Sequence, residues 1–468
     1  WGMGAVVIAA MVLAPLLAVL VIAVLGYNAT GWAHLMATTL PRYFTNSMVM
    51  MLGVGVLAGA IGTATAWFVA SRSFPGRGAL QYLLLAPMAI PSYVAAYALV
   101  DMLEYAGPLQ TALREVFGWS SARDYWFPEI RSRWAAILVM SLSLYPYIYL
   151  FARDAFEGQG MHTLDVSRAL GCTPRQSYWR VSLPLARPAI VAGVAIVMME
   201  VLNDFGTVEY FAVQTLTTGI FTQWLEASNP AGAAEIACLM LGLVLILALV
   251  ERLSRRRRRF HTLARSQRPV TRVEIKGIKR WIASAICAGP VLLGFVLPIS
   301  VIASVSHLED WQAAGLWRAA RNTLLLGAVT ALIAVSAALF LAEAVRHARW
   351  RGIARIMPLT TIGYAAPGAV LAVGVLIPLA FVDNWVADLV LAGTGVEIGL
   401  VLTGSAAALV FAYTVRFFAI AQGAVESGMA QVTPNMDMAA RSLGTGRFGL
   451  MRRVHLPLLR GSILTAIV

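Results

Sequence analysis

The sequence predicts an all-α polytopic membrane protein built from two related halves, and three observations carry this prediction. Of the 468 residues, 59% are hydrophobic and only 13% are charged, whereas a soluble domain has roughly 25% charged residues. Apolar runs recur along the chain at about 20 residues, the length that a helix needs to cross a bilayer. A short polar segment also occurs twice, 273 residues apart.

Ten apolar runs are long enough to span a membrane. Closed barrels are excluded because barrel strands are about half as long as these runs. The runs cover roughly residues 4–25, 47–70, 79–100, 134–151, 189–213, 234–250, 281–304, 323–343, 356–381 and 399–420, and a partial run begins at 462–468.

The charges of the loops alternate as the positive-inside rule describes. The stretch 252–280 holds twelve Lys and Arg and one Glu, which supplies +11 of the net charge of +13. Five arginines follow the fourth run, whereas 214–233 and 382–398 have no Lys or Arg. We therefore expect the arginine-rich loops, the basic linker and the N-terminus in the cytoplasm. We expect no nucleic acid at the linker, because Arg beside a span fixes topology or meets membrane lipid.

The repeated polar segment is the most informative part of the chain. It reads Asp165 to Gly171 and then Val181-Ser-Leu-Pro184, and it returns as Met438 to Gly444 and then Val454-His-Leu-Pro457. Nine of the twenty positions from Arg168 onward are identical in the second copy. A polar island that is duplicated between apolar runs is typical of a docking element presented twice to a two-fold partner.

The residues of the first copy predict two short helices with a turn between them. Thr163 is a suitable N-cap, and Asp165 would lie in the first turn, where a carboxylate suits the helix dipole. Gly171 can adopt positive φ and would end that helix. The sequence Thr173-Pro-Arg-Gln176 then predicts an N-cap, a proline at N1 and a capping-box Gln.

In the second copy Thr433-Pro434 opens the first helix, with Asp437 close behind, and Gly444 can end it. Pro184 and Pro457 lack the N–H that a helix needs. We therefore expect a turn at each of these prolines before the next apolar run.

This pattern resembles the signature loop of permeases in bacterial binding-protein-dependent ABC importers, which reads Glu-Ala-Ala, three residues, Gly, nine residues, Ile, one residue, Leu-Pro. Both copies match at Gly and at Leu-Pro, with Val in place of Ile. The first triplet is Asp165-Val166-Ser167, and the second is Met438-Ala439-Ala440, which lacks the acid, although Asp437 precedes it. Two such loops in one chain resemble the fused permeases of the ferric-iron group.

The resemblance implies the type I ABC-importer permease fold as two tandem parallel six-helix repeats. It implies alternating access driven by a cytoplasmic ATPase dimer, which would hold ATP and Mg, and substrate delivery by a periplasmic binding protein at the bacterial inner membrane. The chain itself would be no enzyme and would carry no cofactor. The residues that would couple to the ATPase are Asp165, Val166, Ser167, Gly171, Leu183, Pro184, Ala439, Ala440, Gly444, Leu456 and Pro457.

The repeat extends beyond the signature loops. Asn46 aligns with Asn322, and Pro91 with Pro367, both at a shift of 276 residues. The predicted domains are a first half at 1–251 with coupling loop 152–188, the linker 252–280, and a second half at 281–468 with coupling loop 421–461. Since the first half continues through two further runs after its signature loop, we expect the chain to lack the C-terminal spans of its second half. The first residue is Trp and not Met, so we also expect a piece before Trp1 to be missing.

The fifth run carries acids at membrane depth, where they are costly and usually face a pathway or a partner. Glu200, Asn203, Asp204 and Thr207 would share one face of a continuous helix, and Glu209 follows. We expect Glu200, Asn203, Asp204 and Glu209 at the translocation pathway, with no firm metal site. Interhelical hydrogen bonds, or a place at the periplasmic end of the span, remain the alternatives.

Several classes of function lack their motifs. The two lysines, Lys276 and Lys279, each follow Ile, so there is no Gly-Lys-Ser/Thr loop for ATP. The three cysteines and six histidines have no metal-ligand spacing. A secondary transporter with 6+6 spans and a membrane-embedded enzyme are the alternatives, although neither needs the duplicated loop.

Ferric iron is the substrate that the resemblance favours, because a hard cation suits carboxylate oxygens. A polyamine ranks next, thiamine is a further alternative, and an oxyanion ranks lowest because three carboxylates would repel it.

Overall fold

The computed structural model describes residues 2–159, 167, 169, 171–256, 272–306, 313–347, 357, 360, 363, 366–429 and 432–467. Sheet within these residues is limited to β1 (Arg72–Ser73) and β2 (Val273–Glu274), which pair in parallel. Nine described helices are long and apolar enough to cross a membrane, or ten if one bent pair is a single span. The predicted all-α polytopic class is therefore confirmed, and the tandem repeat stays a prediction.

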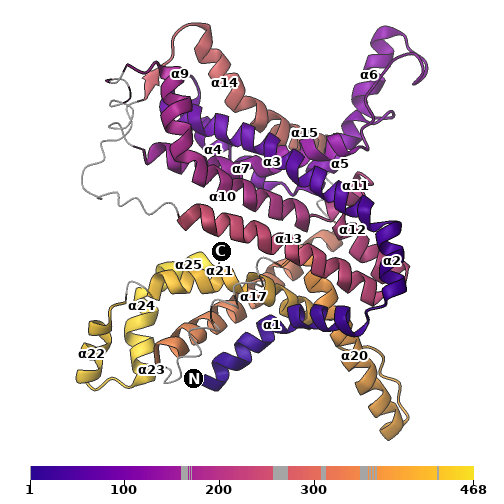
Figure 1. The fold of residues 1–468 in the computed structure, drawn as a ribbon, viewed down its shortest axis with the longest axis vertical. Coiled ribbons are helices and arrows are strands. Elements are labelled where there is room, and N and C mark those ends of the chain that lie inside the picture. Colours follow the sequence, from indigo (N-terminus) through magenta and orange to yellow (C-terminus); the bar gives the residue numbers. More distant parts are fainter. Residues whose placement is uncertain are drawn as a thin grey trace. The chain divides into compact units, whose positions relative to one another are not determined.

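The long helices overlap the predicted apolar runs but differ from them in their bounds (Figure 1). The helix Gly368–Thr394 extends into the predicted loop 382–398, and the span predicted at 189–213 begins at Arg175 and ends at Asn203. The uninterrupted ones are α1 (Gly2–Leu25), α3 (Leu40–Ser71), α7 (Arg133–Glu157), α13 (Pro230–Arg256), α17 (Ala314–His347), α20 (Gly368–Thr394) and α21 (Ala406–Met429). Two further spans contain a π-helical segment: α9 (Pro174–Ser177), η2 (Tyr178–Ser182) and α10 (Leu183–Asn203), and α14 (Ile278–Val291), η4 (Leu292–Val296) and α15 (Leu297–Val305).

The run predicted at 79–100 is broken rather than straight. It contains α4 (Arg77–Leu83), the 3₁₀ turn η1 (Ala86–Ala89), α5 (Ser92–Leu103) and α6 (Pro108–Phe117), and the two parts meet at a bend of 91°. Pro91 is the residue before α5, with φ −55° and ψ 140°, and Pro367 precedes α20 with φ −57° and ψ 146°. Both prolines therefore begin a new helix, because a proline has no N–H to donate to the preceding turn.

The shorter elements lie at the ends of the long helices. They are α2 (Ala29–Ala37), α11 (Gly206–Tyr210), α12 (Leu216–Phe221), η3 (Thr222–Glu226), α22 (Pro434–Ser442), α23 (Arg447–Leu450), η5 (Met451–His455), α24 (Leu456–Leu458) and α25 (Arg460–Ile467).

The chain forms two compact units that cut across the order of the sequence. Unit 1 comprises residues 1–32, 220–241 and 308–468, and unit 2 comprises 33–219 and 242–307. Helix α1 therefore belongs to the unit made mostly of the second predicted half, and α14 and α15 belong to the unit made mostly of the first. Two segments at the starts of the predicted halves are thus exchanged between the units.

Unit 2 is centred on α3, α7 and α10, which pack against one another. Gly62 lets α3 approach α7 closely, because a Cβ atom at that position would lie 2.9 Å from the Tyr145 carbonyl oxygen and from the Ile148 Cβ atom. Gly193 of α10 meets Ile148 from the other side, at 3.0 Å from its Cα atom. Small residues at such crossings let membrane helices pack without a hydrophobic driving force.

Unit 1 packs α17 against α21, and α1 against α20. The closest approach is at Gly374 of α20, where an added Cβ atom would lie 2.1 Å from the carbonyl oxygen of Pro15. Pro15 lies inside α1. Its ring removes the N–H that would donate to the carbonyl of Met11, one turn earlier.

Candidate coupling loops and fifth-span acids

The first signature loop has the predicted turn. Gly171 has φ +81°, and the N–H of Cys172 donates to the carbonyl of Ser167 at 3.0 Å, which closes the end of a helix. The predicted role of Gly171 as the residue that ends the helix is confirmed. Thr163, Asp165 and Val166 lie outside the described residues.

The helix that follows begins with the predicted capping box. The N–H of Thr173 donates to Gln176 Oε1 at 2.9 Å, and the N–H of Gln176 donates to Thr173 Oγ1 at 3.3 Å. The buried hydroxyls of Ser167 and Ser177 are 2.7 Å apart and join the two sides of the turn. Two reciprocal hydrogen-bonding pairs thus fix the direction in which the chain enters α10.

The second signature loop repeats this turn. Helix α22 begins at Pro434 after Thr433, which has extended backbone but makes no capping hydrogen bond with its side chain. Gly444 has φ +78°, and the N–H of Thr445 donates to the carbonyl of Ala440 at 3.1 Å. Equivalent glycines therefore end both loops in the left-handed region, where only glycine is free of strain.

The expected turns at Pro184 and Pro457 are wrong. In each copy a π-helical segment, η2 or η5, ends directly before Leu-Pro, and helix continues through the proline. Pro184 lies in the first turn of α10 within one span from Arg175 to Asn203. In a π turn the backbone N–H groups bond one residue further back than in an α-helix. This shift accommodates the N–H that the proline lacks, so the helix continues.

The predicted coupling residues differ in exposure. Ser167 and Ala440 are buried, and Leu183, Pro184 and Leu456 are half-buried. Gly171, Ala439, Gly444 and Pro457 are exposed. Two apolar side chains of the second loop are also bare, because Met438 is 60% and Leu443 84% exposed. An apolar surface on a polar loop is typical of a site for a protein partner.

A buried ionic cluster anchors the second loop within unit 1. His455 is fully buried and lies between two carboxylates: its Nδ1 contacts Glu343 of α17, and its Nε2 is 2.9 Å from Asp437 Oδ1 of α22. Arg346 Nε donates to Asp437 Oδ2 at 2.6 Å, and its other nitrogens donate to the carbonyl of Val432 at 3.1 Å. The cluster therefore joins α22, η5 and the end of α17 through side chains.

Asp437 is ionised in this cluster. Burial opposes its charge, but the hydrogen bonds from His455 and Arg346 outweigh burial and hold the pKa of the carboxyl below its usual range. Since Asp437 lies in the first turn of α22, the helix dipole favours the same charge. The carboxylate thus acts at once as the anchor of α22 and as the acceptor for Arg346.

The matching place in the first copy has no such charges. Ser182 stands where the second copy has His455, and Trp67 stands where it has Glu343 at the shift of 276 residues. The Trp67 ring contacts the rings of Phe156 and Tyr178, with centroids 5.2 and 4.7 Å away. The Oγ of Ser182 has no hydrogen-bond partner among the described residues. The two loops share the left-handed glycine and the π segment, but the side chains at these matching positions differ in chemistry.

The fifth-span acids do not share one helical face, so that expectation is wrong. Helix α10 ends at Asn203, and Asp204 has extended backbone with φ −71° and ψ 128°. Glu200 and Asn203 are half-buried on α10, and Glu209 is exposed on α11. The break arises because a short polar side chain competes for backbone N–H groups and favours a cap over a helix interior.

Asp204 is occupied as a cap. Its Oδ1 accepts from the N–H groups of Thr207 and Val208 at 2.8 and 3.2 Å, and its Oδ2 accepts from the Ser92 and Thr207 hydroxyls at 2.8 and 2.9 Å. The carboxylate thus starts α11 and ties it to α5. This agrees with the alternative that this acid makes structural hydrogen bonds between helices.

The segment after α11 is tied back to the start of α3. Asn46 Nδ2 donates to the carbonyl of Gln214 at 2.7 Å, and Ser47 Oγ accepts from the N–H of Leu216 at 2.9 Å. Thr217 Oγ1 donates to the carbonyl of Leu202 at 2.7 Å.

No cluster of three or more His, Cys, Asp or Glu side chains suitable for a metal occurs in the described part of the chain.

Two polar features escaped the sequence reasoning. His455 was grouped with scattered histidines, although Glu343 and Arg346 at the end of an apolar run were a signal for a buried partner. Asp383 of α20 accepts hydrogen bonds from the N–H groups of Val401, Leu402 and Thr403 at 2.5 to 3.2 Å. The sequence feature that could have pointed to Asp383 was the presence of an acid inside an apolar run, as at Glu200.

Comparisons with known proteins identify the class of the chain. Residues 55–259 match the family described as the binding-protein-dependent transport system inner membrane component, and this range contains the whole first signature loop. The chain therefore carries a type I permease domain. It is a multi-pass inner membrane protein and a permease subunit of the ABC importer class.

Individual relatives handle different ions. The chain is 24% identical to the Fe(3+)-transport system permease protein FbpB 2 of Haemophilus influenzae, over 88% of this chain and 75% of that protein. A putative ferric transport system permease protein, FbpB 1, of the same organism is 23% identical over 91% of this chain and 67% of its own length. The sulfate transport system permease protein CysT of Escherichia coli is 27% identical, over 43% of this chain and 72% of that protein.

Proposed function

We propose that the chain is the permease of an ATP-driven importer for ferric iron. A periplasmic binding protein delivers the ion, and a separate ATPase dimer drives transport through the two signature loops. The observation that carries the proposal is the extent of the match: the ferric permeases align over 88% and 91% of this chain, whereas the sulfate permease aligns over 43%.

The coupling sites are the two short helices before Gly171 and Gly444. In the second, the exposed side chains of Met438 and Leu443 flank the exposed Ala439, and this apolar face fits a cleft on the ATPase. Asp165, Val166 and Ser167 take the corresponding place in the first loop. The Leu-Pro pairs Leu183-Pro184 and Leu456-Pro457 follow directly after the π segments η2 and η5.

Helix α10 is the part that carries motion from the first loop into the membrane. It has 21 residues from Leu183 to Asn203, which gives a length of about 30 Å at 1.5 Å per residue. The coupling residues lie at one end of this rod, and Glu200 and Asn203 lie at the other. We infer that a push on the loop is carried along α10, which contains Pro188, to these polar groups, as alternating access requires.

The residues that we propose along the path of a passing ion are Glu200, Asn203 and Glu209, while Asp204 positions the start of α11. Fe³⁺ is a hard cation that favours oxygen ligands. Conduction needs ligands that release the ion as readily as they attract it. Scattered carboxylates that lower the electrostatic barrier suit this need better than a chelating cluster.

An oxyanion is the second candidate substrate. Besides the sulfate permease, a probable molybdenum ABC transporter permease of Haloferax volcanii is 28% identical over 42% of this chain and 70% of its own length. Of the three carboxylates that were expected to repel an oxyanion, Asp204 is engaged by four hydrogen bonds at the start of α11.

Uptake measurements decide between these substrates. Cells that lack their other iron importers and express this chain with its partners should accumulate radiolabelled iron, and Glu200→Gln should reduce that uptake. Radiolabelled sulfate and molybdate serve as parallel arms in the same cells. Uptake of an oxyanion without iron would overturn the iron proposal, and full iron uptake by Glu200→Gln would remove Glu200 from the pathway.

A further inference from the structure

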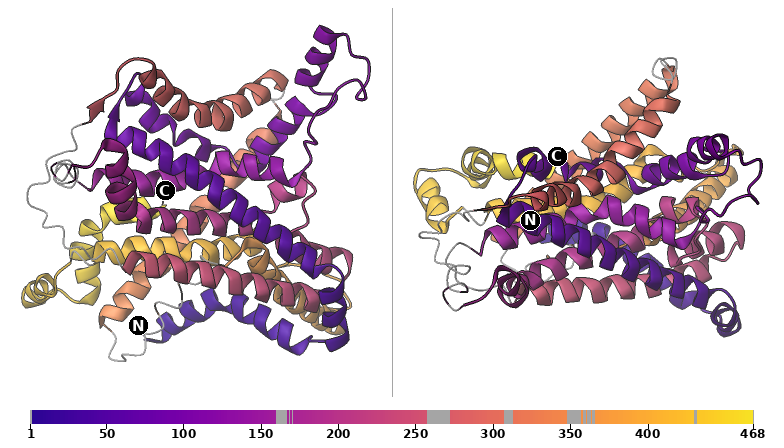
Figure 2. Two further views of the ribbon diagram at one scale, coloured as in Figure 1. Left: turned by 45° about the horizontal axis from the view of Figure 1, so that its top comes forward. Right: turned by 90° about the horizontal axis from the view of Figure 1, so that it is seen from above.

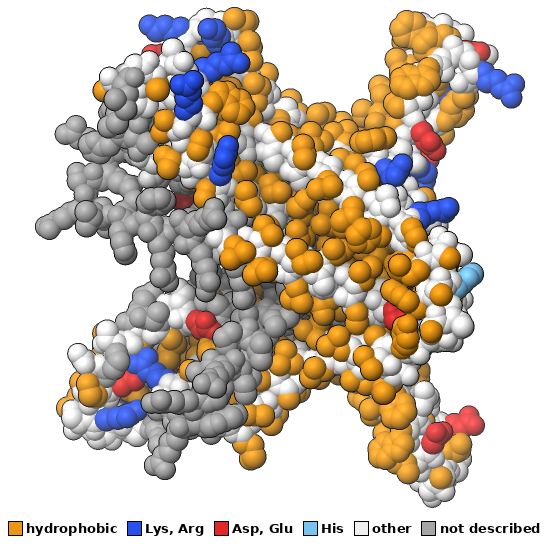
Figure 3. Space-filling view, in the orientation of Figure 1, with side chains coloured by type: hydrophobic (Ala, Val, Ile, Leu, Met, Phe, Trp, Pro, Cys, Tyr) orange, Lys and Arg blue, Asp and Glu red, His pale blue; other side chains and the backbone are white. Residues whose placement is uncertain are grey.

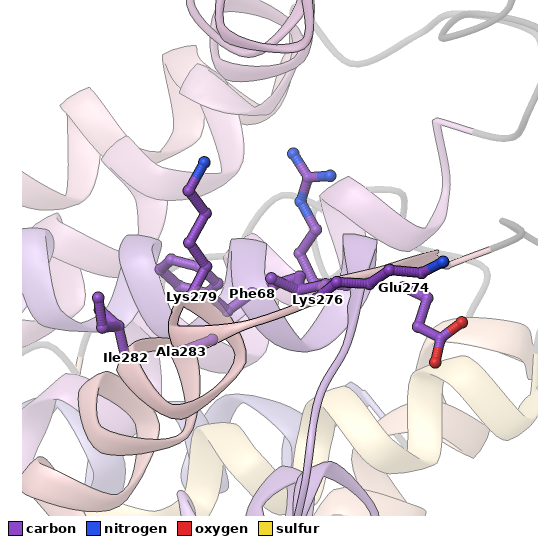
Figure 4. Close-up of a pocket in the computed structure, with 8 residues that line it drawn as sticks. Phe68, Glu274, Lys276, Lys279, Ile282 and Ala283 are labelled. Atoms are coloured by element: carbon purple, nitrogen blue, oxygen red, sulfur yellow. The ribbon is translucent and has the colours of Figure 1, made fainter.

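A basic pocket lies at one end of unit 2, where β1 and β2 pair. It has a volume of about 580 Å³, and Arg72, Lys276 and Lys279 line it together with Glu274. Phe68 and Ile282 contribute apolar surface (Figure 4). Lys and Arg side chains gather at this end of the unit, whereas its long helices are largely covered with apolar side chains (Figure 3). The pocket therefore combines an excess of cations with an apolar wall.

The charge of the pocket favours an anion. Three cations face one carboxylate, so the lining has a net positive charge of two. The side chains of Lys276 and Glu274 extend in the same direction, while that of Lys279 points to another side (Figure 4). Lys276 and Lys279 are both exposed and keep their ammonium groups accessible. At least one cation is thus placed away from Glu274, the one acid among the described residues that line the pocket.

The backbone holds these cations in place. Arg72 pairs with Val273 in the parallel β1–β2 ladder, and the N–H of Ile275 donates to the carbonyl of Ser73 at 3.2 Å. Ser284 Oγ donates to the carbonyl of Pro75 at 2.8 Å, which joins α14 to the turn after β1. The segments before and after the pocket are therefore connected at two points, and α3 and α14 lie side by side in both orientations (Figures 1 and 2).

The pocket lies at the level of the membrane surface. It is formed where one candidate span ends at Ser71 and another begins at Ile278. Ile278 and Trp281 are 72% and 54% exposed, and the Arg280 guanidinium lies 5.4 Å from the Trp281 ring centroid. Exposed Trp and Arg next to apolar side chains mark the boundary between headgroups and acyl chains.

The same end of unit 2 carries the first signature loop. Trp67, one residue from the pocket-lining Phe68, contacts the ring of Tyr178 in η2. Arg272 lies 3.6 Å from Glu157 at the end of α7, which leads into the loop. By the loop charges, this is the cytoplasmic side. The pocket thus lies at the leaflet that faces the ATPase.

We propose that this pocket binds the phosphate headgroup of an anionic phospholipid. Lys279 and Lys276 contact the phosphate oxygens, Arg72 closes the inner side, and the acyl chains run along the exposed Ile282 and Trp281 of α14. Basic pockets between membrane helices on the cytoplasmic side are suited to such headgroups. A free anion in water would use the cations but not the apolar wall, so a lipid fits the whole site.

The test measures lipid retention by the full chain. Purified protein is titrated with phosphatidylglycerol and with phosphatidylcholine, and bound lipid is counted by native mass spectrometry. We expect phosphatidylglycerol to bind selectively, and Lys276→Gln with Lys279→Gln to weaken it about tenfold to thirtyfold, since each cation near the surface contributes to anionic lipid binding. Lys276→Arg with Lys279→Arg should retain binding.

The chain offers a matched control in Arg318 and Arg321. They are also exposed, three residues apart and near the start of a spanning helix, but they do not line the pocket. Their change to Gln should leave lipid retention unchanged. Equal loss in both Gln variants would overturn the proposal, because it would show that surface charge alone attracts the lipid.

Two further measurements separate the lipid from other sources of phosphate. A photoreactive phosphatidylglycerol should label the peptide 273–286 in the parent chain and fail to label it in the Lys→Gln variant. Inorganic phosphate should not displace the lipid. Displacement by millimolar phosphate, or labelling that ignores the substitutions, would overturn the assignment. Thermal midpoints in neutral lipid show that each variant is folded.

Discussion

His455 is the residue whose loss should most strongly release the second signature loop. Its ring lies between Glu343 and Asp437, and all three are nearly solvent-free, with exposed fractions of 0%, 3% and 7%. In His455→Ala the two carboxylates lose their shared partner and face each other across a small cavity. Among the side-chain contacts described above, that of Arg346 with Asp437 still joins α17 to α22.

The cost follows from the hydrogen bonds that are lost. Each hydrogen bond to a charged group contributes about 1.5–3 kcal/mol, so two give about 3–6 kcal/mol. Breaking a buried ion pair by removing one partner costs about 3–5 kcal/mol, which agrees with this range. Since about 1.4 kcal/mol corresponds to tenfold, local opening of α22 should rise more than a hundredfold.

Hydrogen exchange measured by mass spectrometry tests this in the purified chain. Amides of α22 and η5 should exchange faster in His455→Ala, whereas those of α9 and η2 should not change. Ser182→Ala is the matched control, because Ser182 occupies the same motif position and its Oγ has no hydrogen-bond partner among the described residues. Unchanged exchange of α22 in His455→Ala would refute the claim that the cluster anchors this loop.

Four further predictions follow from single sites. Gly171→Val and Gly444→Val should each cost about 1–2 kcal/mol or more from positive φ. No steric clash adds to this cost, since nothing lies within 4 Å of either missing Cβ atom. ATPase coupling should fall while membrane levels hold, and Gly446→Val, where φ is not positive, should leave coupling intact. Gly374→Val should lower the thermal midpoint by forcing α1 away from α20 at a cost of about 1–3 kcal/mol, whereas Gly393→Val, with open space around it, should not. Asp383→Ala should expose the 395–405 loop to protease because three backbone N–H groups lose their acceptor, each bond being worth about 1.5–3 kcal/mol, and equal cleavage rates in both proteins would contradict this. The lowered pKa of Asp437 means that its contribution is complete above the unfolded value of about 3.9 and is lost only as pH falls through the lower folded value; exchange of α22 should therefore show no titration of Asp437 between pH 5 and 8, and a transition there that Asp437→Asn abolishes would contradict the assignment.

Local chemistry made the turns of the signature loops predictable. Gly171 and Gly444 were expected to end helices, and Thr173 with Gln176 to form a capping box, because these features depend on residues within one or two turns. The apolar runs predicted the spans for a similar reason, since the length of a span is set by the bilayer and not by tertiary contacts.

Two predictions about helix ends were wrong. In each case a proline or a polar residue made an arrangement of hydrogen bonds that the sequence pattern did not indicate. Pro184 was expected to stop the helix, but a π turn before it absorbs the missing hydrogen bond. Asp204 was expected inside a helix, but Ser92, more than a hundred residues away, offers its hydroxyl and helps to fix the cap. The second case could not be read from the sequence alone, because its partner lies on another span.

The two signature loops are attached to their neighbouring helices by different contacts, and this difference affects how force enters each half. A turn with the same glycine conformation is attached in one copy by the packed rings of Trp67, Phe156 and Tyr178, and in the other by a charged cluster around His455. Ring packing consists of many small dispersion contacts, so a displacement weakens it gradually. Hydrogen bonds to a buried imidazole are directional, and they hold fully or are lost. A small displacement of the second loop should therefore move α17 more directly than the same displacement of the first loop moves α3. The two halves need not respond equally to one conformational change of a symmetric partner.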